Sequence, residues 1–301
     1  MNKNNSIQLL KETLILIGGA YAPSTIRAYK SNFERFITFC EINFTNALPA
    51  DSATIVKFIQ KLTTSSLKSS SIRIAIASIS TMHKLNQLPD PTQLPPAKLE
   101  LRRMHRTLGR ASKQALGITA PMMEKMVLAT KNDLRGLRDK ALVLLAYDSL
   151  CRRSELASLR LDDIEFSDAG LPFLLRLRKS KTDQEAIGKK IRLNNSSSEA
   201  IKRWIDCGKI AEGLLFRGIR NNGDISGGIN PSQINRIYKR LASRAHFREE
   251  QIKNISGHSF RVGAAQDLLT SGATLSSIMA RGRWSKPDTA MRYLESFGHI
   301  N

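Results

Sequence analysis

The sequence has few of the features that define disulfide-rich, zinc-binding or membrane proteins. Its three cysteines, Cys40, Cys151 and Cys207, are odd in number and widely spaced, which argues against a disulfide framework and against a zinc site. No apolar run approaches the ~18 residues of a membrane span. The opening segment is partly apolar, but Lys11 and Glu12 interrupt it. We therefore expect an amphipathic start, no signal peptide and a cytoplasmic protein.

Motifs of nucleotide- and metal-dependent enzymes are also missing. The phosphate-binding motif G-x-x-x-x-G-K-[ST] is absent, and neither acidic residues nor Cys and His have the spacing of a metal site. We therefore expect no nucleotide, no metal and no other cofactor. An enzyme of this composition that acts on phosphate esters would have to neutralise its transition state with guanidinium groups, helped by imidazole or indole donors.

Positive charge is what the chain has in excess. It holds 47 Lys and Arg against 26 Asp and Glu, a formal net charge of +21. Residues 1–108 carry 14 basic and 6 acidic groups, and residues 119–301 carry 31 basic and 20 acidic groups. If the excess were confined to a tail, it would indicate a solvated arm. Because it is present in both halves, it indicates that a polyanion binds along both halves of the protein. We expect nucleic acid as a partner, hence a nucleoid-associated protein, and no membrane.

The length of 301 residues suits two domains, each with its own core. We place a linker at residues 109–118, between a first domain of residues 1–108 and a second domain of residues 119–301. The alternative boundary is the segment PDPTQLPP, whose four prolines disfavour helix. That choice would assign the basic segment after the prolines to the second half.

The first half has the periodicity of helices. In PSTIRAYKSNFERFITFCEI, Ser24 or Thr25 can cap a helix whose apolar residues form one stripe. The stripe consists of Ile26, Tyr29, Phe33, Phe36, Ile37 and Cys40. SSSIRIAIASISTMHKL is ambiguous, because its isoleucines alternate as in a strand. Its length and its Ala and Ser content favour a helix with a small polar face that suits close approach to a phosphate backbone.

The second half mixes helices with a short sheet. GLPFLLRLRKSKT and KKIRLNN are alternating runs joined by a polar turn, which predicts a β-hairpin. Most other segments have helical patterns, with Asn230 and Pro231 as a helix start and Gly272 as a helix stop. The expected fold class is therefore mainly α, with an all-α first domain and an α+β second domain that contains a small antiparallel sheet.

Six side chains of the second half suit phosphoryl chemistry without metal. They are Arg152, Lys181, His258, Arg261, Trp284 and Tyr293. Taken singly, each has a structural interpretation as well: H-x-x-R occurs by chance, a hairpin lysine is usually solvated, and the two aromatics can simply pack a core or a terminal helix. Glu155 can pair with Arg152 in a purely structural way.

The order of these residues resembles the tyrosine recombinase (phage integrase) family. The local matches are YDSLCRRSEL around Arg152, GHSFRVGAAQDLL around Arg261 and RGRWSKPDTAMRYL before the end. A tryptophan where many members have histidine, and RASKQAL before the second domain, resemble the Cre-like members. Over residues 1–108 the resemblance is one of organisation only, a helical domain that opens with ST-x-R-x-Y.

The resemblance implies a core-binding, SAM-like helical DNA-binding domain and a catalytic domain that cuts and rejoins DNA. Arg152 and Arg261 would bind the scissile phosphate, and His258 and Trp284 would donate hydrogen bonds to it. Lys181 would protonate the leaving 5′ oxygen. Tyr293 would attack the phosphorus and form a 3′-phosphotyrosyl link without ATP or metal.

Three further points stay open in the sequence. Glu155 would orient Arg152, although Arg153 beside it could face the phosphate instead. The family implies a homotetramer on two DNA sites with inverted-repeat half-sites and a Holliday-junction intermediate, yet only a short segment follows Tyr293. That segment puts cyclic exchange of a long tail in doubt. The alternative functions are a non-catalytic DNA-binding or architectural protein of the same fold, in which TSGATLSSIMARGRW would form a helix-turn-helix, and a type IB topoisomerase-like relaxing enzyme.

Overall fold

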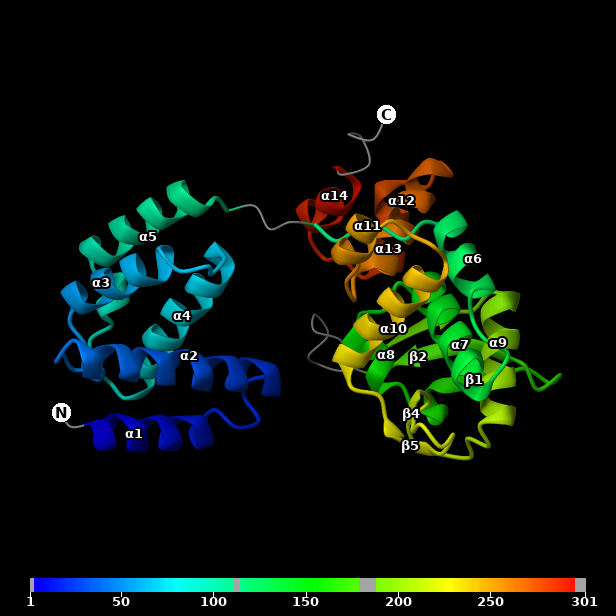
Figure 1. Ribbon diagram of the computed structural model, residues 1–301, viewed down its shortest axis with the longest axis horizontal. Helices are drawn as coiled ribbons and strands as arrows, with labels where there is room; N and C mark the ends of the chain where they lie inside the picture. Colours follow the sequence, from blue (N-terminus) through cyan, green and yellow to red (C-terminus); the bar gives the residue numbers. More distant parts are fainter. Residues whose placement is uncertain (1–2, 111–113, 179–187, 296–301) are drawn as a thin grey trace. The chain divides into compact units, whose positions relative to one another are not determined.

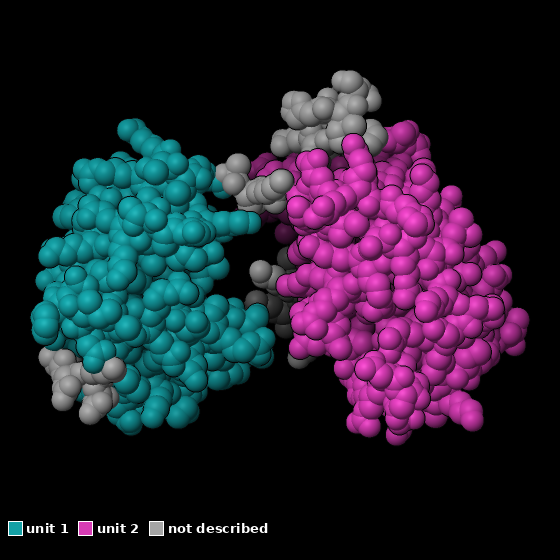
Figure 2. All heavy atoms as spheres, viewed as in Figure 1, with its two compact units in different colours: residues 1–113 teal, residues 114–301 magenta. Residues whose placement is uncertain are grey.

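The computed structural model describes residues 3–110, 114–178 and 188–295 (Figure 1). The chain divides into two compact units, residues 1–113 and residues 114–301 (Figure 2). The division falls inside the segment 109–118 that the sequence marks as a linker. Within the described residues, no helix combines the length and apolarity that crossing a bilayer requires.

All regular elements of the first unit within residues 3–110 are helical. Its elements are α1 (Lys3–Leu16), α2 (Pro23–Ile42), α3 (Ser52–Thr63), α4 (Ser69–Leu85), the 3-10 turn η1 (Pro91–Gln93) and α5 (Pro95–Leu108). The basic segment after the prolines forms α5, and Ala97 and Met104 of α5 belong to the core of this unit. Pro95 and Pro96 are therefore the first two residues of the last helix of the first unit, where a missing N–H is tolerated.

Helix α4 settles the ambiguity in the sequence. Ile72 and Ile76 are buried, whereas Ile74 between them is 44% exposed. Burial at a spacing of four residues is the signature of a helix, because successive side chains of a strand would alternate. The helix predicted from length and composition is confirmed.

The predicted stripe of α2 is buried through Phe33, Phe36, Ile37 and Cys40. The predicted cap was wrong, since α2 begins at Pro23 with Ala22 at the N-cap position and no side-chain cap. Proline presets the backbone of a first helical turn, so the helix starts one residue before the expected serine.

The second unit surrounds a small sheet with helices. Its helices are α6 (Ala120–Leu128), α7 (Leu134–Ser149), α8 (Arg153–Ser158), η2 (Leu161–Asp163), α9 (Asn195–Cys207), α10 (Pro231–Arg244), α11 (Glu249–Asn254), α12 (Ser259–Thr270), α13 (Leu275–Gly282) and α14 (Pro287–Glu295). Its strands are β1 (Ile164–Phe166), β2 (Pro172–Leu177), β3 (Lys189–Arg192), β4 (Arg217–Ile219) and β5 (Ile225–Gly228). The expected class, mainly helical with small antiparallel sheets, is confirmed.

The predicted hairpin corresponds to β2 and β3, which pair antiparallel. Leu175 of β2 lies opposite Ile164 of β1 on one side and Ile191 of β3 on the other, and all three are buried. The alternate residues therefore form the inner face of a three-stranded sheet in the order β1-β2-β3. The β4-β5 hairpin was not predicted, because strands of three and four residues carry almost no periodic signal.

Two helix boundaries follow their predicted signals. The Asn230 side chain accepts a hydrogen bond from Ser232 N–H at 2.9 Å, and Gln233 accepts one from Asn230 N–H at 2.7 Å, which together cap α10. Gly272 follows the end of α12 with φ +84°, a left-handed conformation that favours glycine.

Candidate catalytic site

The first part of the site lies at the break between α7 and α8. Leu150 adopts a left-handed conformation, φ 50°, which ends α7 and turns the chain sharply. Arg152 then occupies the N-cap position of α8, and Glu155 is the third residue of that helix. The Glu155 carboxylate accepts from Arg152 N–H at 2.8 Å and from the Arg152 guanidinium at 2.8 Å. Glu155 therefore both caps α8 and holds the Arg152 side chain.

The structure distinguishes the two adjacent arginines. The Arg152 side chain is 16% exposed and pairs with the buried Glu155. Arg153 is exposed, and its stem passes close to Gly257, where an added Cβ would lie 2.5 Å from Arg153 Cδ. Arg152 is therefore the arginine that is held by the carboxylate.

The second part of the site lies at the start of α12. His258 is the N-cap residue and is exposed, whereas Arg261 one turn later is 1% exposed. Arg261 Nη1 donates to the Leu150 carbonyl at 2.7 Å, and its Nη2 donates to the Gly282 carbonyl. The guanidinium carbon lies 4.4 Å from the centre of the Trp284 ring. Two carbonyls and an aromatic face together compensate for burying this cation.

The third part of the site is an aromatic stack. Trp284 and Tyr293 have ring centroids 5.2 Å apart and planes 28° apart. Trp284 packs closely on Gly282, where an added Cβ would lie 2.3 Å from the indole, so that position requires glycine. Gln114 Nε2 donates to the Arg292 carbonyl at 2.6 Å, and Gln266 Nε2 donates to the Tyr293 carbonyl at 3.3 Å. These two amides hold the last turn of α14. The Tyr293 side chain is half-buried, and its ring is positioned by the stack on Trp284.

Charge in this region is mostly positive, and the pKa directions show it. Burial, the largest cause, and the charges of Arg152 and Arg283 lower the pKa of Arg261 to about 10. The pKa of His258 lies below its usual value of 6.5, first because of desolvation and then because three guanidiniums repel an added proton. Those guanidiniums belong to Arg261, Arg153 and Arg152. His258 is therefore expected to be neutral at pH 7, with a ring nitrogen able to accept a proton.

Glu155 is the carboxylate that balances part of this charge. Burial by itself would raise its pKa, but the charge of Arg283 and the hydrogen bonds from Arg152 outweigh burial, so the pKa of Glu155 lies below its usual value of 4.5. Glu155 is therefore ionised at pH 7, as a partner of two guanidiniums must be.

Five of the six predicted catalytic residues, and Glu155, lie in this one region of the second unit. The exception is Lys181, which lies outside the described residues. Sequence reasoning missed Arg283, which donates to Glu155 Oε2 at 3.0 Å. Its neighbour Trp284 was a signal that this turn belongs to the site, but the partners of Arg283 are more than 120 residues away in the sequence.

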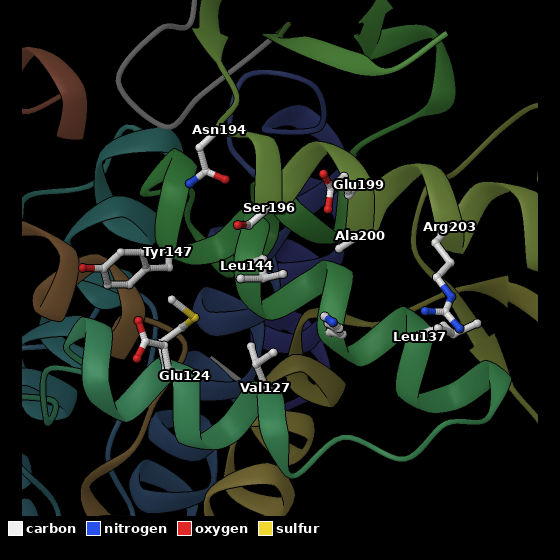
Figure 3. Close-up of a pocket in the computed structure, with 12 residues that line it drawn as sticks. Glu124, Val127, Leu137, Leu144, Tyr147, Asn194, Ser196, Glu199, Ala200 and Arg203 are labelled. Carbon is white, nitrogen blue, oxygen red and sulfur yellow. The ribbon is translucent and has the colours of Figure 1, made fainter. Parts of the chain in front are cut away.

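A cavity of about 410 Å³ lies elsewhere in the second unit, among α6, α7 and α9. Figure 3 shows Tyr147 and Asn194 toward one end and Arg203 and Leu137 toward the other. None of the predicted catalytic residues lines it. Among the described residues, no three His, Cys, Asp or Glu side chains are grouped to hold a metal ion.

Comparison with known proteins matches this architecture. Residues 118–299 match the model of the phage integrase family, and residues 7–86 match its N-terminal SAM-like domain. The chain is 24% identical over 293 residues to recombinase Cre of Escherichia phage P1, covering 92% of this chain and 85% of Cre. It is 26% identical over 288 residues to an integrase/recombinase XerD homolog of Selenomonas ruminantium, covering 91% and 82% of the two chains.

Solved structures share the fold. The XerH site-specific recombinase bound to palindromic difH substrate has a TM-score of 0.67 at 16% identity, over 91% of this chain and 79% of XerH. The Tn1549 transposon integrase in complex with circular intermediate DNA has a TM-score of 0.65 at 15% identity, over 96% and 94%. The helical SAM-like unit, the helical unit with its small sheets and the match over residues 118–299 lead to one conclusion. The chain belongs to the phage integrase family, the tyrosine recombinases, which break and rejoin DNA.

Proposed function

We propose that this chain is a site-specific DNA recombinase that cuts and rejoins DNA through a 3′-phosphotyrosyl intermediate. One observation carries the proposal. Tyr293 stacks on Trp284, and Trp284 also covers Arg261. The Trp284 indole therefore contacts both the Tyr293 phenol and the buried Arg261 guanidinium. Arg152 joins the same group through Glu155 and the Leu150 turn.

The phosphate-binding step uses the arginines. Arg152 and Arg261 neutralise the two non-bridging oxygens of the scissile phosphate, because guanidinium donors match phosphate geometry and keep their charge at neutral pH. The N–H groups of His258 and Trp284 add hydrogen bonds to the developing charge. Preorganised donors of this kind stabilise a transition state more than they stabilise the ground state.

The covalent step is a balanced exchange at phosphorus. The Tyr293 oxygen bonds to phosphorus, its proton passes to the neutral ring of His258, and the bond from phosphorus to the 5′ oxygen breaks. Lys181 supplies the proton to that leaving oxygen. The phosphotyrosyl link keeps the energy of the broken ester, so a 5′ hydroxyl from another strand can reverse the step without ATP.

The proposed substrate is double-stranded DNA with inverted-repeat half-sites, bound by a homotetramer that holds two sites and exchanges strands through a Holliday junction. Basic groups in excess on both halves of the chain support a polyanion that contacts both units. Two-fold symmetry of the DNA site is what a symmetric pair of subunits would require.

The test is trapping of the covalent intermediate. Duplexes selected for binding from a random-sequence pool would carry a nick shortly 3′ of the scissile phosphate. The short fragment that bears the released 5′ hydroxyl then diffuses away, and rejoining stops. Tyr293→Phe should bind DNA as tightly as the unaltered protein and form no adduct, since the stacked ring remains and the nucleophilic oxygen is gone. Tyr238→Phe is the matched control, because Tyr238 is buried in the core against Phe260 and should leave adduct formation unchanged.

Each outcome decides something. An adduct with Tyr293→Phe would show that another residue is the nucleophile. Binding without any adduct from the unaltered protein would favour a non-catalytic DNA-binding protein. Relaxation of supercoiled DNA that lacks the selected site would favour a topoisomerase-like enzyme.

A further inference from the structure

Arg283 has an unusual backbone for its residue type. It follows α13 with φ 56°, in the left-handed region that disfavours L side chains. It stands between Gly282, which Trp284 covers, and Trp284 itself. A residue held in such a conformation indicates that the surrounding contacts determine it.

Those contacts are made by the Arg283 guanidinium. Nη2 donates to Glu155 Oε2 at 3.0 Å and to the Leu150 carbonyl at 3.2 Å, and Nη1 donates to the Ser149 carbonyl at 3.0 Å. The side chain is 7% exposed, and its Nε is buried without a hydrogen-bond partner. The fork of the guanidinium is therefore used to join α8, the end of α7 and the turn before Trp284.

Two acceptors of Arg283 are shared with the proposed phosphate-binding arginines. Glu155 also accepts from Arg152, at 2.8 Å through its other oxygen. The Leu150 carbonyl also accepts from Arg261, at 2.7 Å. A shift of Arg283 would consequently disturb both guanidiniums at once.

We infer that Arg283 is a positioning residue for DNA cleavage, which holds Glu155 and the Leu150 carbonyl so that Arg152 and Arg261 keep the geometry that a phosphate needs. Arg283 also holds the left-handed turn that directly precedes Trp284, and so it determines the position of the Trp284 backbone. This inference rests on the proposed function, and it assigns to one arginine the coupling of the break between α7 and α8 with the turn after α13, which lies 128 to 134 positions later in the chain.

The neighbouring Arg281 provides a matched control. It also ties α13 to α7, with Nη2 donating to Asp148 Oδ1 at 2.7 Å and to the Asp148 carbonyl at 2.9 Å. It shares no acceptor with Arg152 or Arg261 in these contacts. If tying α13 to α7 were all that mattered, loss of Arg281 and loss of Arg283 would have similar consequences.

The experiment measures adduct formation at saturating nicked duplex, and DNA affinity separately. Arg283→Gly relieves the backbone strain but removes the fork, so the cleavage rate should fall about 100-fold, the effect of a misplacement of about 1 Å, with the DNA dissociation constant nearly unchanged. Arg283→Lys keeps the charge and one donor. Its cleavage rate should therefore lie between those of Arg283→Gly and the unaltered protein, about tenfold below the latter. Arg281→Ala should cleave within a few-fold of the unaltered rate.

A coupling measurement separates positioning from general stability. In a Glu155→Gln background, Arg283→Gly should lower the rate much less than it does alone, because the shared acceptor is already weakened. Full additivity would contradict the inference, as would an unaltered rate for Arg283→Gly or an equal loss for Arg281→Ala. If Arg283→Gly does not fold, Arg283→Lys decides: an unaltered rate overturns the inference, and a tenfold loss with unchanged affinity supports it. Absence of adduct from the unaltered protein would instead overturn the proposed function.

Discussion

Glu155 holds Arg152 by two hydrogen bonds of 2.8 Å, one from its backbone N–H and one from its guanidinium. The bond to the backbone N–H caps the start of α8, and the bond to the guanidinium orients the Arg152 side chain. One buried carboxylate thus connects local secondary structure with the chemistry proposed for the site.

The first prediction separates the adjacent arginines. Arg152→Ala should lower the rate of adduct formation by about 100- to 1000-fold, the effect of removing one preorganised donor, because the Glu155-held guanidinium is lost. Arg153→Ala should lower it less than about tenfold, since Arg153 is exposed and has no such support. Single-turnover cleavage of the nicked duplex measures both. The reverse order would place Arg153 at the phosphate.

The second prediction concerns stability. Glu155→Gln leaves two guanidiniums without their anion and should lower the free energy of unfolding at pH 7 by roughly 3 kcal/mol, as breaking a buried ion pair does. The pKa of Glu155 is lowered by folding, so its contribution is present above its usual value of 4.5 and is lost as pH falls through the lower folded value. The difference between the two proteins should therefore shrink at acid pH.

Denaturant titrations followed by tryptophan fluorescence check this. Both tryptophans, Trp204 and Trp284, lie in the second unit, so the signal reports that unit. Glu165→Gln is the control, because the Glu165 ion pairs with Arg176 and Lys190 are solvent-accessible and such pairs contribute little. A difference that grows toward acid pH would contradict the assigned direction.

The third prediction tests Lys181, which lies outside the described residues. Lys181→Ala should slow cleavage of ordinary DNA, because the 5′ oxygen loses its proton donor. A duplex with sulfur in place of that 5′ oxygen should restore the rate, since a thiolate leaves without protonation. Arg152→Ala should gain much less from the same duplex, because its defect is in stabilising phosphate charge. Lack of recovery for Lys181→Ala would mean that another group protonates the leaving oxygen.

The fourth prediction concerns the first unit. A hollow of about 560 Å³ lies between α2 and α4, lined by small residues, by Tyr29 and Ile74, and by the exposed Arg73. Ser70 and Ala77 of this lining belong to the small polar face of α4, which we expect to approach a phosphate backbone. Arg73→Ala should weaken DNA binding and reduce the slope of log affinity against log salt by about 1, as loss of one phosphate contact does.

Filter binding over a series of salt concentrations measures that slope. Lys11→Ala on α1 is the control, because it removes one exposed positive charge away from the hollow. Equal changes for Arg73→Ala and Lys11→Ala would indicate that net charge, and not this face, determines the affinity.

The sequence alone determined part of the local structure. The stripe of α2, the caps of α10 and the β2-β3 hairpin follow from periods of 3.6 and 2 and from capping residues, which act over a few positions. The order of Arg152, His258, Arg261, Trp284 and Tyr293 also made the site recognisable, because each stands in a distinctive short motif.

Only the tertiary structure decided how these residues support one another. Arg283 stands in no helical stripe, and its acceptors Ser149, Leu150 and Glu155 lie 128 to 134 positions earlier in the chain. The burial of Arg261 under Trp284 likewise depends on two segments brought together by the core. Hydrogen bonds and ring contacts need atoms a few ångströms apart, and the distance between residues remote in sequence is set by packing of the whole unit.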